Sequence, residues 1–206
     1  MTVENNKKMQ LFSNYRDSYD FMFDRSGEPF IRYSVDMLSR RDCFKLLDVC
    51  GIKAVTHGLV KDLLPYYARR TFLIYLNEKL HATEGKLLVN ADKDSYYSNY
   101  ASIVEGIPAL SYRVLNIGNR QWKLEYKSDD VFFSNKGNVE ISLIAELKEK
   151  EQYPRPLHGR NFWAIDFVKS NSELKACDFN TAPAIQGTPI EKLLSATEIV
   201  DLIKYY

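Results

Sequence analysis

Two acidic residues and an asparagine near the carboxyl end of the sequence have the residue types of a metal site. Asp166 lies in an apolar run at 162–168, and Asp178 and Asn180 lie in a second run at 174–180, beyond a polar turn. Side chains of a strand alternate between the two faces of a sheet. If the runs pair as an antiparallel hairpin in which even-numbered residues oppose even-numbered residues, all three side chains share one face. Carboxylate and amide oxygens are the ligands that Mg²⁺ prefers, so this pattern favours a magnesium site.

The alternative is that the two acids are unrelated, solvent-facing residues of an amphipathic hairpin. The neighbours of Asp166 favour a functional role, because an unpaired carboxylate among Trp163, Ile165 and Phe167 is costly to bury. Two adjacent carboxylates repel each other, so without a metal we expect the pair to be strained or to share a proton.

The overall composition excludes several classes of protein. The chain has 206 residues, of which 45% are hydrophobic and 27% charged, enough for one domain or two small packed lobes. A net charge of +1 without a basic stripe disfavours nucleic-acid binding. No apolar run is long enough to span a membrane or to act as a secretion signal. Three scattered cysteines without a CxxC pair favour a reduced, cytoplasmic location.

Local patterns predict the elements that must position these residues. A capping box at Ser39 and Asp42, an apolar stripe that includes Cys43 and Cys50, and Gly51 at the end predict a buried helix at about 40–50. Capping boxes at 188–191 and 195–198 predict helices near the end of the chain. Alternating apolar residues predict strands at 71–76, 86–90, 112–117, 121–126, 131–133, 139–144, 162–168 and 174–180. The expected fold is therefore α+β, with two lobes and antiparallel sheets around a cleft.

The acidic hairpin resembles the end of the ATP-grasp domain. Ala164-Ile-Asp-Phe-Val168, followed by Cys177-Asp-Phe-Asn-Thr-Ala-Pro-Ala184, is similar to an Asp strand followed by Glu-x-Asn-x-x-Pro. The resemblance implies that Asp166, Asp178 and Asn180 hold the magnesium ions that bridge the ATP phosphates, with Asp178 in place of the commoner Glu.

A second stretch, Ile107-Pro-Ala-Leu-Ser-Tyr-Arg-Val114, is similar to the Gly-x-Glu-Tyr-Arg-Val strand of the same family. The resemblance implies that Arg113 is catalytic and faces the γ-phosphate and the acyl-phosphate intermediate. Ser111 stands where the family has an acid. His158 and Arg160 precede the first acidic strand and are expected to face the nucleotide or the substrate.

The resemblance also implies a division of the chain. Residues 41–107 correspond to the nucleotide-covering lobe and residues 108–206 to the lobe with the metal and phosphate site, while residues 1–40 form an extension of unclear role. The family's Lys-Pro is missing after the strand at 71–76, and the following loop has a single glycine. Lys79 and Lys86 are the candidates to supply the cations that bind phosphate, and the alternative for each is an ordinary surface lysine.

The function implied is that of an ATP-grasp-like ligase with ATP and Mg²⁺ as cofactors. Such a ligase activates a carboxylate of a small molecule or peptide as an acyl phosphate, which an amine or thiol then attacks. The alternative is a non-catalytic ATP-grasp descendant that acts as a binding or assembly protein, and the altered lysine strand and Ser111 motivate it. Whether the chain forms a homo-oligomer or binds a protein partner stays open.

Overall fold

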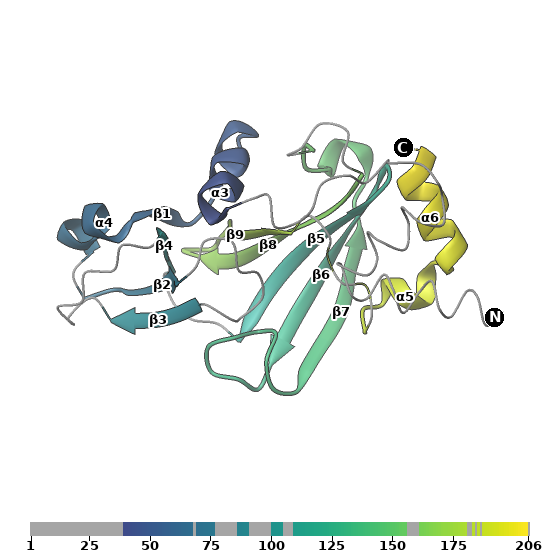
Figure 1. Cartoon of the computed structure of the whole chain (residues 1–206). Coiled ribbons are helices and arrows are strands. Elements are labelled where there is room, and N and C mark those ends of the chain that lie inside the picture. The colour runs from purple at the N-terminus through teal and green to yellow at the C-terminus, as the bar shows by residue number, and fades with distance from the viewer. Residues whose placement is uncertain are drawn as a thin grey trace.

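Two antiparallel sheets form the frame of the protein (Figure 1). The computed structural model describes residues 39–67, 69–76, 86–90, 100–104, 109–155, 161–180, 183, 185 and 187–205. The smaller sheet has the order β1-β4-β2-β3, with β1 at Thr56–Leu59, β4 at Tyr100–Ile103, β2 at Thr71–Tyr75 and β3 at Lys86–Asn90. The larger sheet has the order β7-β6-β5-β8-β9, with β7 at Val139–Glu146, β6 at Arg120–Ser128, β5 at Leu110–Ile117, β8 at Phe162–Ser170 and β9 at Glu173–Asn180.

Short helices pack against both sheets, and those on the larger sheet cover both of its faces. They are α3 at Arg40–Val49, α4 at Val60–Tyr67, the 3-10 turn η2 at Glu149–Glu151, α5 at Ile190–Leu193 and α6 at Ala196–Tyr205. Ile190, Ile199 and Ile203 pack α5 and α6 on one face, against a core that includes Leu115 and Trp122. No helix among the described residues has the length and apolarity to cross a membrane.

Helix α3 packs on the opposite face and along the edge of β9. Its buried residues Cys43, Phe44 and Leu47 join a core with Trp163 and Ile165 of β8. The predicted capping box is present, with the Ser39 side chain accepting from the Asp42 amide and the Asp42 carboxylate accepting from the Ser39 amide. After the helix, the backbones of residues 53–55 exchange hydrogen bonds of 2.8 and 2.9 Å with Ala176, which covers the outer edge of β9.

The predicted hairpin at 112–126 is confirmed, and its turn is tightly packed. Ile117 pairs with Arg120, so Gly118 and Asn119 alone make the turn. Gly118 has a φ of +65°, and a β-carbon there would lie 2.5 Å from the Leu202 carbonyl oxygen of α6. Glycine is therefore required both by the backbone conformation and by the closeness of the helix.

The strand predicted at 131–133 is wrong, because a side chain binds that backbone instead. The Asp130 carboxylate accepts hydrogen bonds of 2.8 Å from the amides of Phe132 and Phe133. These amides are then unavailable for a strand partner, and the segment is a loop between β6 and β7.

Candidate functional site

A bulge in the β8–β9 hairpin places the two acids opposite each other. Asn171 and Ser172 form a two-residue turn with φ values of 48° and 70°, and beside it even residues pair with odd ones. The register then shifts, so that Phe167 pairs with Ala176 while Asp166 pairs with Asp178. Cys177 is the additional residue of a β-bulge. Beyond it, even residues oppose even residues, and Asp166, Asp178 and Asn180 share one face.

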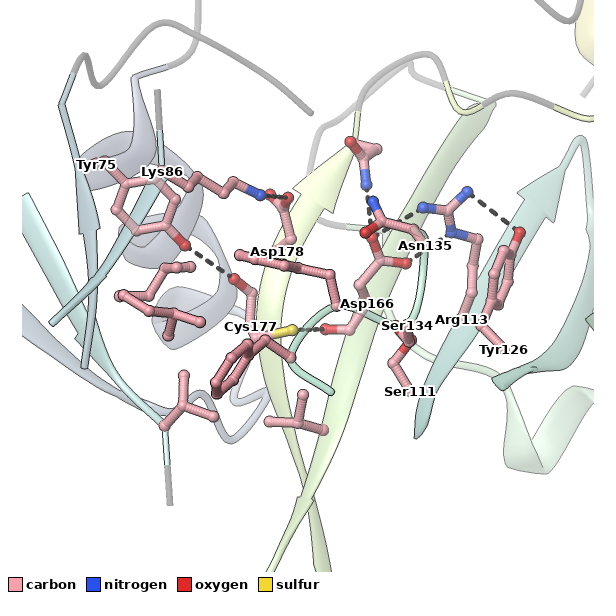
Figure 2. Close-up of a pocket in the computed structure, with 17 residues that line it drawn as sticks. Tyr75, Lys86, Ser111, Arg113, Tyr126, Ser134, Asn135, Asp166, Cys177 and Asp178 are labelled. Atoms are coloured by element: carbon pink, nitrogen blue, oxygen red, sulfur yellow. Dashed lines mark hydrogen bonds and ion pairs between the residues drawn. The ribbon is translucent and has the colours of Figure 1, made fainter. Parts of the chain in front are cut away.

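Arg113 of β5 continues this row across a third strand. The register pairs Arg113 with Asp166, and the two side chains form a bidentate ion pair with Nε–Oδ1 and Nη2–Oδ2 distances of 2.6 and 2.9 Å (Figure 2). Asn180 Nδ2 donates to the same carboxylate at 3.0 Å. Arg113 Nη1 also donates to the Tyr126 hydroxyl at 3.4 Å. Burial alone would lower the pKa of Arg113, but the Asp166 carboxylate outweighs it and raises this pKa, so the guanidinium stays charged.

Asp178 pairs with two cations that come from outside the larger sheet. Its Oδ1 accepts from Nη1 of Arg40, the first residue of α3, and its Oδ2 accepts from Nζ of Lys86 on β3 at 3.2 Å. Lys86 lies directly opposite Tyr75 in the β2–β3 pair, and both cations lie over the Tyr75 ring, at 5.0 Å for Arg40 and 5.6 Å for Lys86. Burial, with Arg40 nearby, lowers the pKa of Lys86 to about 8.

These five side chains, Arg40, Lys86, Arg113, Asp166 and Asp178, are called the ion-paired cluster below. With three cations and two carboxylates it carries one net positive charge. All five are largely buried, with exposed side-chain fractions between 1% for Arg40 and 20% for Asp166. A site of this kind favours a ligand with several negative charges, because burial weakens screening by water and salt.

Four members of the ion-paired cluster, Lys86, Arg113, Asp166 and Asp178, border a cavity of about 170 Å³ between the two sheets. One part of the cavity wall is apolar and consists of Leu73, Leu88, Val104 and Val168. Another part is uncharged and polar, and consists of Ser111, Ser134 and Asn135. Ser111 and Ser134 share a hydrogen bond of 2.5 Å, which ties β5 to the β6–β7 loop. The cavity wall thus combines charged, apolar and uncharged polar side chains.

The residue types of a metal site are present, but both of its carboxylates form ion pairs with arginine or lysine side chains. Asp166, Asp178 and Asn180 provide the oxygen donors that suit Mg²⁺. Within the described ranges, no group of three or more His, Cys, Asp and Glu side chains is arranged to hold a metal. The structure also differs from the expectation that the two acids are strained by mutual repulsion, since Arg113 neutralises Asp166, and Arg40 and Lys86 neutralise Asp178.

The structure brings together most of the side chains singled out in the sequence. Arg113, Asp166, Asp178, Asn180 and Lys86 meet at the cavity. The predicted roles of Lys79, His158 and Arg160 fall on residues outside those described.

Arg40 was missed by the sequence analysis, because it lies 138 residues from its partner Asp178. One signal of its role was present, since a cation in the first turn of a helix opposes the helix dipole and needs a reason to be there. Tyr75, which packs beneath Arg40 and Lys86, carried no such signal.

Comparison with known proteins identifies the fold and nothing finer. No protein-family model and no curated protein matches the chain. Among solved structures, the chain is similar to D-alanine–D-alanine ligase from Bacillus anthracis complexed with ATP, with a TM-score of 0.53 and 14% identity over 80% of this chain and 64% of that chain. It is also similar to the ATP-grasp ligase PsnB complexed with a phosphomimetic variant of its minimal precursor, Mg and ADP, with a TM-score of 0.60 and 10% identity over 98% of this chain and 72% of that chain.

This chain spans just under two thirds of the length of the Bacillus anthracis ligase, 64%. Its two antiparallel sheets, with few helices, correspond to the architecture of both ligases. The chain therefore has the ATP-grasp fold.

Proposed function

We propose that the cavity binds Mg-ATP and that the chain activates a carboxylate as an acyl phosphate, which an amine or thiol then attacks. The observation that carries this proposal is the convergence of charged side chains from the two sheets on one cavity. Arg113, Asp166 and Asp178 stand in register on three neighbouring strands, and Lys86 approaches from the other sheet. The fold shared with ATP-dependent ligases supports the same reaction class.

The apolar and charged residues of the cavity wall suit the two ends of ATP. The apolar part around Leu73, Leu88 and Val168 can accommodate the adenine ring. The phosphates would then lie at the ion-paired cluster, where Arg40, Lys86 and Arg113 supply positive charge.

Arg113 has the properties needed to stabilise the transferred phosphoryl group. Its raised pKa keeps the guanidinium charged, and its pairing with Asp166 and Tyr126 fixes its orientation before the ligand arrives. Asp166, Asp178 and Asn180 would hold Mg²⁺, which when bound neutralises phosphate charge. The reaction needs no protein nucleophile, which is consistent with Cys177, whose pKa burial raises to about 12.

The second candidate is a non-catalytic protein that acts in binding or assembly. The observation in its favour is that β2 ends in Tyr75, a buried side chain whose hydroxyl donates to the Cys177 carbonyl oxygen at 3.4 Å. Lysine is absent from β2, where the resemblance would place one near the end of the strand.

Thermal unfolding with the non-hydrolysable analogue adenylyl imidodiphosphate and Mg²⁺ tests the binding step. A ligand at a hundred times its Kd stabilises the folded state by about 2.7 kcal/mol, which raises the Tm by roughly 5–10 °C in a chain of this size. Absence of any shift at millimolar Mg²⁺ and analogue would refute the ligase and would favour the non-catalytic candidate.

Release of ADP, with trapping of acyl phosphate by hydroxylamine, separates the two candidates. An active ligase should release ADP when its carboxylate is present in a substrate mixture, and Arg113→Met should slow this release about 100-fold or more. The matched control is Arg120→Met, which removes an exposed arginine paired with Glu146 on the same sheet. Binding of the analogue without ADP release from any mixture would favour the non-catalytic candidate.

A further inference from the structure

We propose that Arg40, Lys86 and Arg113 keep the carboxylates closed to Mg²⁺ until a polyphosphate draws these cations away. This inference rests on the proposed function and concerns how its metal site forms. Metal and nucleotide then bind as a coupled pair, and neither binds well alone.

Both carboxylates are fully paired with cationic side chains. Asp166 Oδ1 and Oδ2 accept from Arg113 at 2.6 and 2.9 Å, while Asp178 Oδ1 accepts from Arg40 and Oδ2 from Lys86 at 3.2 Å. All four carboxylate oxygens therefore face a cationic donor. A metal ion bound to these oxygens would lie beside the cationic donors, and repulsion between like charges opposes its binding unless the donors move.

Burial makes that movement costly for either ligand alone. The exposed side-chain fractions are 1% for Arg40, 12% for Lys86 and 18% for Arg113, so water cannot fully replace a lost carboxylate. A metal that arrives without phosphate would leave these buried cations unpaired, which is strongly unfavourable. A polyphosphate that arrives without metal would draw the cations off and leave Asp166 and Asp178 unpaired on adjacent strands.

Simultaneous binding avoids both costs. The cations exchange the carboxylates for phosphate oxygens, and the carboxylates exchange the cations for the metal, so every buried charge keeps a partner. By linkage, the metal then raises the affinity for nucleotide by the same factor as the nucleotide raises the affinity for metal. The magnesium site would thus be formed by the substrate and not be present beforehand.

Binding of Mn²⁺ to the full chain, followed by electron paramagnetic resonance of the free ion, tests the coupling. We expect Mn²⁺ to bind the complex of protein and adenylyl imidodiphosphate at least tenfold more tightly than it binds either the protein alone or the free analogue alone. Equal affinity with and without the analogue would overturn the inference. Failure of the analogue to bind under any condition would instead contradict the proposed function.

Removal of one cation tests the same inference without nucleotide. Arg113→Gln frees Asp166 from its guanidinium and should raise the affinity for Mn²⁺ alone at least tenfold, with Arg120→Gln as the control that changes nothing. If Arg113→Gln fails to fold by circular dichroism, Lys86→Gln takes its place, since it opens one oxygen of Asp178. A folded variant that binds Mn²⁺ no better than the wild type would refute the inference, whatever the result with nucleotide.

Discussion

Replacing Asp178 by asparagine should strongly destabilise the folded protein, even though it removes one of two neighbouring acids. The substitution keeps the size of the side chain but removes the negative charge that faces Arg40 and Lys86. Both cations are largely buried, with 1% and 12% of their side chains exposed, and neither can turn to water for compensation. The effect should therefore be a loss of stability and not a relief of repulsion.

The size of the loss follows from the geometry. At the Lys86–Asp178 distance of 3.2 Å the attraction is about 5 kcal/mol at an effective dielectric constant of 20, before desolvation is subtracted. Removing one partner of a buried ion pair costs about 3–5 kcal/mol. For a chain of this length that corresponds to a fall in Tm of roughly 6–20 °C.

Urea unfolding followed by tryptophan fluorescence measures this difference directly. Trp122 and Trp163 are both buried, with 1% and 0% exposed, so their emission reports the loss of the core. The control is Glu173→Gln, which breaks an exposed ion pair with Lys53 and should change the free energy of unfolding by less than about 1 kcal/mol. An Asp178→Asn variant as stable as the wild type, or more stable, would refute the ion-pair reasoning and restore the picture of two repelling acids.

Three further substitutions have defined outcomes. The pKa of Lys86 is lowered to about 8 in the folded state, so between about pH 8 and pH 10 Lys86 binds more protons in the unfolded chain than in the folded one. Lys86 therefore makes the free energy of unfolding rise with pH in this range. Lys86→Met should lack this rise when urea midpoints are compared at pH 7.5 and 9.5. Gly118→Ala should lower the Tm by several degrees, because the added β-carbon would lie 2.5 Å from the Leu202 carbonyl oxygen. Ser172→Gly should raise the free energy of unfolding by up to about 1 kcal/mol in the same urea assay, because Ser172 has a φ of 70°; an unchanged or lower midpoint would show that the turn is not strained.

Features governed by neighbouring residues could be predicted from the sequence. The helix at 40–49 follows from the capping box at Ser39 and the glycine at 51, and the β5–β6 hairpin follows from Gly118-Asn119 between alternating strands. Both depend on hydrogen bonds between residues close in the chain. The loop at 131–133 was misread because its apolar residues suit a strand, while the side chain of Asp130 decides its backbone hydrogen bonds.

The prediction that the two acids share one face assumed that even-numbered residues oppose even-numbered residues, and the turn alone does not produce this pairing. A two-residue turn at Asn171 and Ser172 pairs even residues with odd ones, which would place Asp166 and Asp178 on opposite faces. The additional residue, Cys177, restores the parity, and nothing in its local sequence marks it as a bulge. The partners of Asp178 were beyond prediction for another reason, since Arg40 and Lys86 arrive through tertiary packing.

The position of Arg40 in the chain has a consequence for the order of folding. Its partner Asp178 follows 138 residues later, and the backbone bonds between residues 53–55 and Ala176 join the same distant segments. During synthesis, α3 therefore leaves the ribosome long before the strand on which it packs, and it cannot be buried until β9 exists. Closing so long a loop is entropically unfavourable, so docking of α3 should be a late event in folding. The ion-paired cluster should therefore be among the last parts of the protein to form.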